Sequence, residues 1–320
     1  MKSNLSRFSR FFSSNKASLL GAAARAGLLL GVSAAFLGAP ATVSAAPADA
    51  AGTVTLQLRK RSPEGEVSIK PTPWKVEETA IIVGDMWDTH WCTHAAARVN
   101  ELAPAVNTFL NAARAKGIKI VHAPSECMGF YKNFPARHNL LRTKLKMRNR
   151  WYGWGQGGGS EAPLPIADSS SGSGVGCPEC KDNDRAPYPW RRQHASIEIK
   201  NNDYITDGDK GEILGFLSSN NIKNVLFVGV HTNMCLLGRA SGMRHIRGFL
   251  NAALVRDLTD CMYNNPKGEK SEAPGVDHWA GQELINKHIE TWIGPSFLSS
   301  DITGRKSFRF REDNRPQEKR

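Results

Sequence analysis

The stretch from Val225 to Cys235, VLFVGVHTNMC, constrains the fold of this chain more than any other feature. It begins with an apolar run, Val225 to Val230, that only Gly229 interrupts. Such a run is typical of a strand buried on both faces of a parallel sheet. The polar step HTN follows, and the next residues, LLGRASGMRHIRGF, are spaced as in a helix with Leu236, Met243 and Ile246 inward. We therefore predict a strand, a turn and a helix, with Cys235 at the turn.

A cysteine at the start of a helix lies near free backbone N–H groups and the positive end of the helix dipole. Such positions lower a cysteine pKa from about 8.5 to roughly 3.5–7.5. The N–H groups around His231 and Cys235 would also form an oxyanion hole for a carbonyl held over the sulfur. These features predict that Cys235 is a nucleophile. The alternative is that Cys235 is a small buried apolar side chain, as most free cysteines are.

A second segment, TAIIVGDMWDTHWC, repeats this pattern of an apolar strand followed by polar residues. Asp85 stands at the end of the strand, and ligand and catalytic groups in open α/β sheets gather outside the carboxyl ends of strands. A carboxylate at that position can accept the proton of a nearby thiol, although an N-cap role would also explain it. Candidates for the walls of a substrate pocket are Trp87, Asp88, His90, His122 and Asn233.

The remaining periodic segments alternate between helices and strands, which favours an α/β fold. We predict helices over 95–115, 211–218 and 282–293, and strands over 118–122, 195–200 and 251–256. The strand over 195–200, ASIEIK, would bring Lys200 to the same sheet edge as Asp85 and Cys235. Right-handed crossovers between such strands give a three-layer, doubly wound and mostly parallel sheet.

Four further parts flank or interrupt this α/β domain, which we place at 76–297. Residues 1–46 combine five basic residues, an apolar run and a small-residue cleavage pattern, so we predict an export signal cut near Ala45 or Ala46 and a periplasmic or extracellular protein. Residues 47–75 contain a predicted hairpin, and 130–195 form a long insertion without clear periodicity. Residues 298–320 carry seven Lys or Arg and four Asp or Glu, which predicts a basic, disordered tail.

The net charge of +12 does not indicate a nucleic-acid binder, because the leader and the tail hold much of it and no nucleic-acid motif accompanies it. After removal of the leader, no segment is long and apolar enough for a membrane span.

Cys177 and Cys180 form a CxxC pair inside a Gly/Ser-rich part of the insertion. In an exported chain a local disulfide fits this spacing. A redox site is less favoured, because the pair does not lie between a strand and a helix. Zinc is a third interpretation, with His194 as a further ligand, but four ligands cannot be named. We therefore predict no metal and no cofactor.

These residues together resemble the isochorismatase-like cysteine hydrolases, a superfamily that includes nicotinamidases, N-carbamoyl amidohydrolases and isochorismatases. The resemblance covers roughly 79–293, and its most specific parts are GVHTNMC and the downstream VRDLTD. It implies a catalytic set of Asp85, Lys200 and Cys235, with a cis peptide near Val230–His231. The metal cluster of nicotinamidases is not supplied by HAPSECMGFY.

The resemblance implies a hydrolase that cleaves a carbon–nitrogen bond of a small amide or ureide through a thioester on Cys235. It also implies a small-molecule substrate and a homo-oligomer. Two alternatives remain open. One is vinyl ether hydrolysis of the isochorismatase type, in which cysteine is not needed. The other is a thiol-redox or binding protein that uses Cys177 and Cys180.

Overall fold

The computed structural model describes residues 52–146, 159–166, 187–263 and 276–316. The predicted export signal and the Cys177–Cys180 pair lie outside the described residues. Within those residues an eight-stranded sheet has the order β2-β1-β8-β7-β6-β3-β4-β5. The strands are β1 (Thr53–Arg61), β2 (Val67–Lys75), β3 (Thr79–Gly84), β4 (Lys119–Ala123), β5 (Tyr204–Ile205), β6 (Asn224–Val230), β7 (Asn251–Asp260) and β8 (Ser296–Phe297).

The six strands from β8 to β5 run parallel, and β1 and β2 extend the sheet as an antiparallel hairpin. This arrangement confirms the predicted mostly parallel α/β fold. Every residue of β3 and β6 is buried, as expected for the two central strands. The hairpin is part of the same sheet, because Arg59 of β1 pairs with Ser296 of β8.

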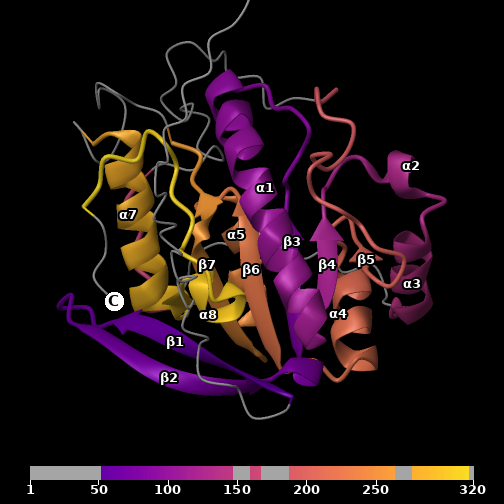
Figure 1. The fold of residues 1–320 in the computed structure, drawn as a ribbon, viewed down its shortest axis with the longest axis horizontal. Helices are drawn as coiled ribbons and strands as arrows, with labels where there is room; N and C mark the ends of the chain where they lie inside the picture. Colours follow the sequence, from indigo (N-terminus) through magenta and orange to yellow (C-terminus); the bar gives the residue numbers. More distant parts are fainter. Residues whose placement is uncertain (1–51, 147–158, 167–186, 264–275, 317–320) are drawn as a thin grey trace, which may run out of the picture. The chain divides into compact units, whose positions relative to one another are not determined.

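Helices cover both faces of the sheet and give three layers. Helix α1 (Thr93–Lys116) and the short α8 (Ser300–Thr303) contribute to the core on one face. The core on the other face receives side chains from α4 (Lys210–Ser219), α5 (Cys235–Gly238), α6 (Met243–Ile246), and α7 (His278–His288) with its π-helical extension η3 (Ile289–Ile293). Figure 1 shows α1 lying along the sheet beside the central strands.

Gly84 and Gly229 let the two central strands approach closely at their carboxyl ends. They are paired in register, and Gly229 has a φ of 104°, which favours glycine. A Cβ added to Gly229 would lie 2.2 Å from the carbonyl oxygen of Gly84. Asp85 and the turn that leads to Cys235 follow directly from this contact, so the sequence of the two strands places both groups at one point of the sheet edge.

Three predicted elements differ from the structure. Residues 195–200 form turns and irregular chain, and the strand at this position is the two-residue β5 farther along. The segment after β6 forms two four-residue helices, α5 and α6, rather than one long helix. The insertion begins with structure of its own, because α2 (Met128–Tyr131) and α3 (Pro135–Thr143) fold within or next to its first residues.

The predicted disordered tail is packed against the fold over residues 298–316. Ile302 and Phe310 are buried, and the Phe310 ring lies 5.3 Å from the ring of Trp279 on α7. Arg311 forms an ion pair with Glu101 on α1 at 3.6 Å. The apolar residues among the basic ones therefore give this segment a buried side. Its net charge alone does not indicate that side.

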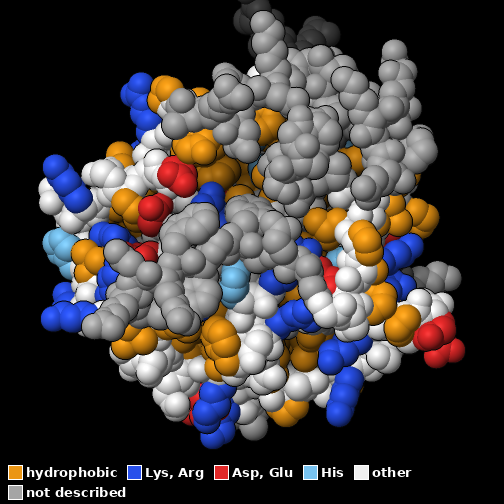
Figure 2. All heavy atoms as spheres, turned by 180° about the vertical axis from the view of Figure 1, so that it is seen from behind, with side chains coloured by type: hydrophobic (Ala, Val, Ile, Leu, Met, Phe, Trp, Pro, Cys, Tyr) orange, Lys and Arg blue, Asp and Glu red, His pale blue; other side chains and the backbone are white. Residues whose placement is uncertain are grey.

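Within the described residues, no helix has both the length and the apolar character needed to cross a bilayer. On the face drawn in Figure 2, Lys and Arg side chains are dispersed among hydrophobic and neutral ones.

Candidate active site

Asp85 is the first residue after β3 and its side chain is fully buried. Its backbone has a φ of 42°, an uncommon value for aspartate, which turns the chain sharply at the strand end. The Ser125 N–H donates to Oδ1 at 3.0 Å, and Nε of Arg239 donates to Oδ2 at 2.7 Å. The carboxylate is therefore held by one neutral and one charged donor, in an orientation set by β3, β4 and the segment after α5.

Cys235 is the first residue of α5, and its thiol is buried beside Asp85 and Arg239, with side-chain hydrogen bonds to both. Burial and, to a smaller extent, the Asp85 carboxylate together raise the pKa of the Cys235 thiol to about 12, although Arg239 opposes the rise. The predicted lowering of this pKa is wrong. Helix α5 has only four residues, so its dipole is weak, and burial next to a carboxylate has the larger effect.

The cation of the site is Arg239, not the predicted Lys200. Arg239 lies four residues after Cys235, and its side chain is 21% exposed. Burial disfavours its charge, but the Asp85 carboxylate and Cys235 raise its pKa well above the usual range. Lys200 is 48% exposed and pairs with Glu198 at 2.9 Å. Because residues 195–200 form no strand, the chain does not deliver Lys200 to the sheet edge.

The turn between β6 and Cys235 contains a cis peptide bond between Val230 and His231, at the place that the resemblance implied. In this turn the Thr232 N–H donates to the Asp260 carbonyl at 2.9 Å, and the Leu236 N–H donates to the His231 carbonyl at 3.2 Å. Within the described residues, no backbone carbonyl accepts from the N–H of His231 or of Cys235. The oxyanion hole formed by these two N–H groups stays a prediction.

Aromatic side chains form one wall next to Cys235, in the same buried cluster. Trp87, two residues after Asp85, stacks on Trp190 with ring centroids 4.1 Å apart, and Tyr188 stacks on the far side of Trp190 at 4.4 Å. The ring of His90 lies 5.5 Å from that of Trp190. Trp87 thus lies in the same buried cluster as Cys235, with His90 close to it, and their role in a substrate pocket stays a prediction. Tyr188 and Trp190 come from the insertion and were missed; the aromatic residues of its YPW triplet are the signal that could have identified them.

Three buried polar atoms around this wall lack a hydrogen-bond partner in the described part of the protein: Oγ of Ser125, Nε1 of Trp190 and Nε2 of His231. Ser125 is tied to the site twice, because its N–H donates to Asp85 and its carbonyl accepts from Nε1 of Trp87 at 3.0 Å. Buried polar groups normally have partners, so these atoms are candidates for hydrogen bonds to a bound substrate.

The other three predicted pocket residues support the structure instead. His122 is held between Gln193 Oε1 and Asp203 Oδ2, each at 3.1 Å. Asn233 exchanges two hydrogen bonds with the backbone of Met262 and so fixes the end of β7. The Asp88 carboxylate accepts from the N–H groups of Arg191 and Arg192, which anchors the end of the insertion.

Two further carboxylates, those of Glu126 and Asp207, lie near Arg239. Glu126 lies 4.0 Å from its guanidinium, and the Glu126 N–H donates to the carboxylate of Asp207 at 2.7 Å. Burial raises the pKa of Asp207. Within the described residues, no group of three or more His, Cys, Asp or Glu side chains is placed to hold a metal ion.

The histidines of the site predict a loss of stability in weak acid. Burial, together with the charge of Arg98, lowers the pKa of His90 from 6.5 to about 4, and burial also lowers that of His231. The Cys92 N–H donates to Nδ1 of His90 at 3.0 Å, which requires that nitrogen to be unprotonated. The folded state therefore favours neutral His90, a contribution present above pH 6.5 and lost as the pH falls toward 4.

Denaturant unfolding at pH values across that window should show this slope, and His90→Gln should reduce it. An equal slope in His90→Gln would assign the acid sensitivity to other groups. Asp203 does not contribute to the pH dependence of stability between pH 6.5 and about 4. Its side-chain hydrogen bonds to His122 and Arg114 overcome the effect of burial and lower its pKa to about 2.

The chain is similar in structure to several known proteins. No protein-family model and no curated protein matches the chain. Among solved structures, a cysteine hydrolase from Pseudomonas syringae pv. phaseolicola 1448A is 14% identical, with a TM-score of 0.46, over 73% of this chain and 94% of that one. An isochorismatase family protein from Burkholderia thailandensis is 13% identical, with a TM-score of 0.39, over 71% and 95%. An isochorismatase-like hydrolase from Alkaliphilus metalliredigens is 12% identical, with a TM-score of 0.40, over 71% and 97%.

Proposed function

We propose that this protein is a cysteine hydrolase that cleaves a carbon–nitrogen bond of a small amide or ureide. The observation that carries the proposal is the buried contact of the Cys235 thiol with both Asp85 and Arg239. A nucleophile, a proton acceptor and a fixed positive charge lie together, which is the arrangement that nucleophilic catalysis requires. A cysteine buried only for packing needs neither a carboxylate nor a guanidinium beside it.

The raised pKa of Cys235 means that the resting thiol keeps its proton. Asp85 takes that proton as the sulfur attacks the carbonyl carbon, and the guanidinium of Arg239 lies beside the sulfur as it becomes negative. The N–H groups of His231 and Cys235 donate to the carbonyl oxygen while it carries the negative charge. Asp85 then gives the proton to the leaving nitrogen, so the C–N bond breaks and ammonia or an amine departs. A thioester on Cys235 remains.

Water completes the reaction. It gives a proton to Asp85 as its oxygen attacks the thioester carbonyl, and the C–S bond breaks when the tetrahedral intermediate collapses. The sulfur recovers its proton from Asp85, which restores the resting state. Arg239 cannot act as an acid or base here, because its guanidinium stays protonated throughout. Its part is to orient Asp85 and to hold positive charge next to the sulfur.

The charges around the site also favour this reaction over vinyl ether hydrolysis of the isochorismatase type. Isochorismate carries two carboxylates and would need cationic partners. In the described part of the site the charge of Arg239 is already matched by Asp85, and Glu126 and Asp207 add negative charge nearby. We therefore propose a substrate that is neutral or cationic. The aromatic wall of Trp87 and Trp190 suits a planar group.

The test is ammonia release by the full-length protein from a panel of small amides, ureides and imides that includes neutral, cationic and anionic members. We expect turnover of neutral or cationic members, and an acyl group on Cys235 in acid-quenched samples analysed by peptide mass spectrometry. Turnover of an anionic vinyl ether that survives Cys235→Ala, without ammonia release from any amide, would support the isochorismatase-type alternative. The export signal and the homo-oligomer remain proposals from the sequence.

A further inference from the structure

A cavity lies between β7, α7 and the C-terminal segment 306–316. Its volume is about 760 Å³, within the range of sites for small organic ligands. The segment 306–316 forms one side of it, and α7 forms another through Glu283, Leu284 and Lys287. Arg256 and Asp257 of β7 also line the cavity, at the place where the pairing of β6 and β7 shifts in register. None of its lining residues belongs to the Asp85–Arg239–Cys235 site.

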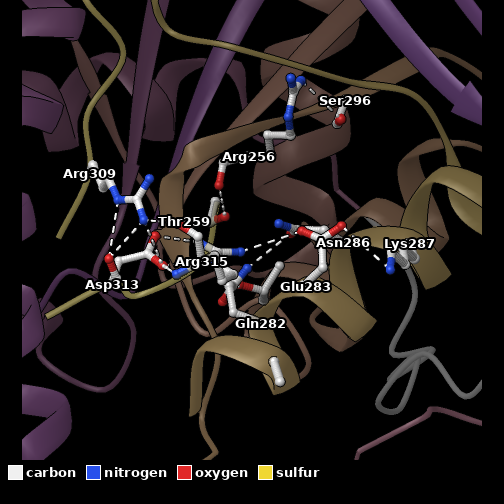
Figure 3. Close-up of polar contacts among 12 residues, drawn as sticks. Arg256, Thr259, Gln282, Glu283, Asn286, Lys287, Ser296, Arg309, Asp313 and Arg315 are labelled. Carbon is white, nitrogen blue, oxygen red and sulfur yellow. Dashed lines mark hydrogen bonds and ion pairs between the residues drawn. The ribbon is translucent and has the colours of Figure 1, made fainter. Parts of the chain in front are cut away.

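Two acidic residues of this cavity, Asp257 and Asp313, are held by partners in the described chain. The Asp257 carboxylate accepts from the N–H and the hydroxyl of Ser299, at 2.7 and 2.5 Å, and from the Phe308 N–H at 3.0 Å. The Asp313 carboxylate accepts two hydrogen bonds from one edge of the Arg315 guanidinium, from Nε at 2.9 Å and from Nη2 at 2.8 Å. Figure 3 shows Asp313 and Arg315 side by side. Arg315 therefore balances the charge of Asp313, whereas burial raises the pKa of Asp257 and so disfavours its negative charge.

The basic residues outnumber the acidic ones among the lining side chains. Five are basic and three acidic: Arg256, Lys287, Lys306, Arg309 and Arg315 against Asp257, Glu283 and Asp313. The Glu283 carboxylate forms ion pairs with three cations, Arg61, Lys287 and Arg315. Within the described chain Lys306 forms no ion pair. The cavity therefore has a net positive charge.

Most of the other lining residues are apolar and include Leu284, Leu298 and Phe308, while Thr259, Asn286 and Ser307 are polar and uncharged. We infer that this cavity binds a small amphipathic anion, with an apolar body and a phosphate or carboxylate group. The oxyanion would face Lys306 and the neighbouring guanidinium groups, while the apolar body would contact the leucine and phenylalanine side chains. The inference is independent of the proposed hydrolase function, because it uses no residue of the Cys235 site.

Calorimetric titration of the full-length protein tests the inference with phenyl phosphate and phenylacetate as probes and phenylethanol as the uncharged comparison. We expect one of the two anions to bind more tightly than the alcohol, and the anion that does so identifies the oxyanion. Binding should weaken as salt is added, because the attraction between exposed charges is screened. Tighter or equal binding of the alcohol would overturn the inference.

Lys306→Glu reverses one charge at the cavity without breaking an ion pair, and it should weaken binding of the preferred anion by about tenfold at low salt. Lys132→Glu, a charge reversal at an exposed position after α2, is the matched control and should change the affinity by less than about twofold. Equal weakening in both variants would show a general charge effect, and no weakening in Lys306→Glu would place the anion elsewhere. Either result would refute the assigned site.

Discussion

Cys235→Ala should lower kcat for the best amide substrate by at least about 10⁴-fold. The substitution removes the sulfur that forms the thioester, so the proposed reaction loses its nucleophile. The change removes one small buried atom, so the fold should persist. The measurement is steady-state ammonia release, with circular dichroism and a denaturant titration to verify that the variant is folded.

Cys127→Ala is the matched control for this prediction. Cys127 is also a buried thiol, it belongs to the same cluster as Cys235, and burial raises its pKa to about 12 as well. Its Sγ donates to the Pro124 carbonyl at 2.8 Å rather than to Asp85. We expect Cys127→Ala to keep kcat within about tenfold of the unchanged protein. If the Cys127 variant is inactive and the Cys235 variant is active, the wrong thiol has been assigned.

The positions of Asp85 and Cys235 at one sheet edge could be predicted from the sequence, because each residue follows the end of a buried strand. A short, almost entirely apolar run identifies a central strand of a parallel sheet, and the residues after such strands meet at one edge. The structure agrees: Gly84 and Gly229 pair in register, and the two residues follow from that point. These features are local, and a short window of sequence contains all of them.

The predicted position of Lys200 was wrong because it depended on a single strand prediction, for residues 195–200, that rested on a short alternating pattern. The alternation in ASIEIK is what a half-buried strand requires, but the segment forms turns, and Arg114 on α1 binds the Asp203 carboxylate at 2.7 Å just after it. Arg239 could not be identified from periodicity, because the helix expected after Cys235 stops at Gly238. Where a side chain points after a four-residue helix depends on tertiary packing.

The pKa of Cys235 was misjudged for a related physical reason. A helix dipole stabilises a thiolate only when the helix is long enough and the thiol is near solvent. In this protein the thiol is buried and faces a carboxylate, so the protonated form is favoured. The depth of burial is a property of the whole fold, and it reverses the direction that the sequence predicted.

Arg239→Met should lower kcat/KM by about 10²–10³-fold, the second large effect, whereas Lys200→Met should leave it within about twofold. Without Arg239 the buried Asp85 carboxylate loses its charged partner, and a buried unpaired carboxylate takes up a proton. A protonated Asp85 cannot accept the thiol proton. Lys200→Met removes only an exposed pair with Glu198, so the two variants separate the structural assignment from the one that the resemblance implied.

Arg239→Met could lose activity simply because it unfolds, and two further variants distinguish that case. Arg239→Lys keeps the charge but loses the planar donor geometry, so it should be folded and retain part of the activity. Asp85→Asn combined with Arg239→Met removes both charges, which should restore stability because no unpaired charge stays buried, yet leave the protein inactive. A stable and inactive double variant, together with a partly active Arg239→Lys, assigns the loss to chemistry. If Arg239→Met stays fully active while Lys200→Met loses turnover, the positive charge that the reaction uses comes from Lys200 and the arrangement of the site changes during catalysis.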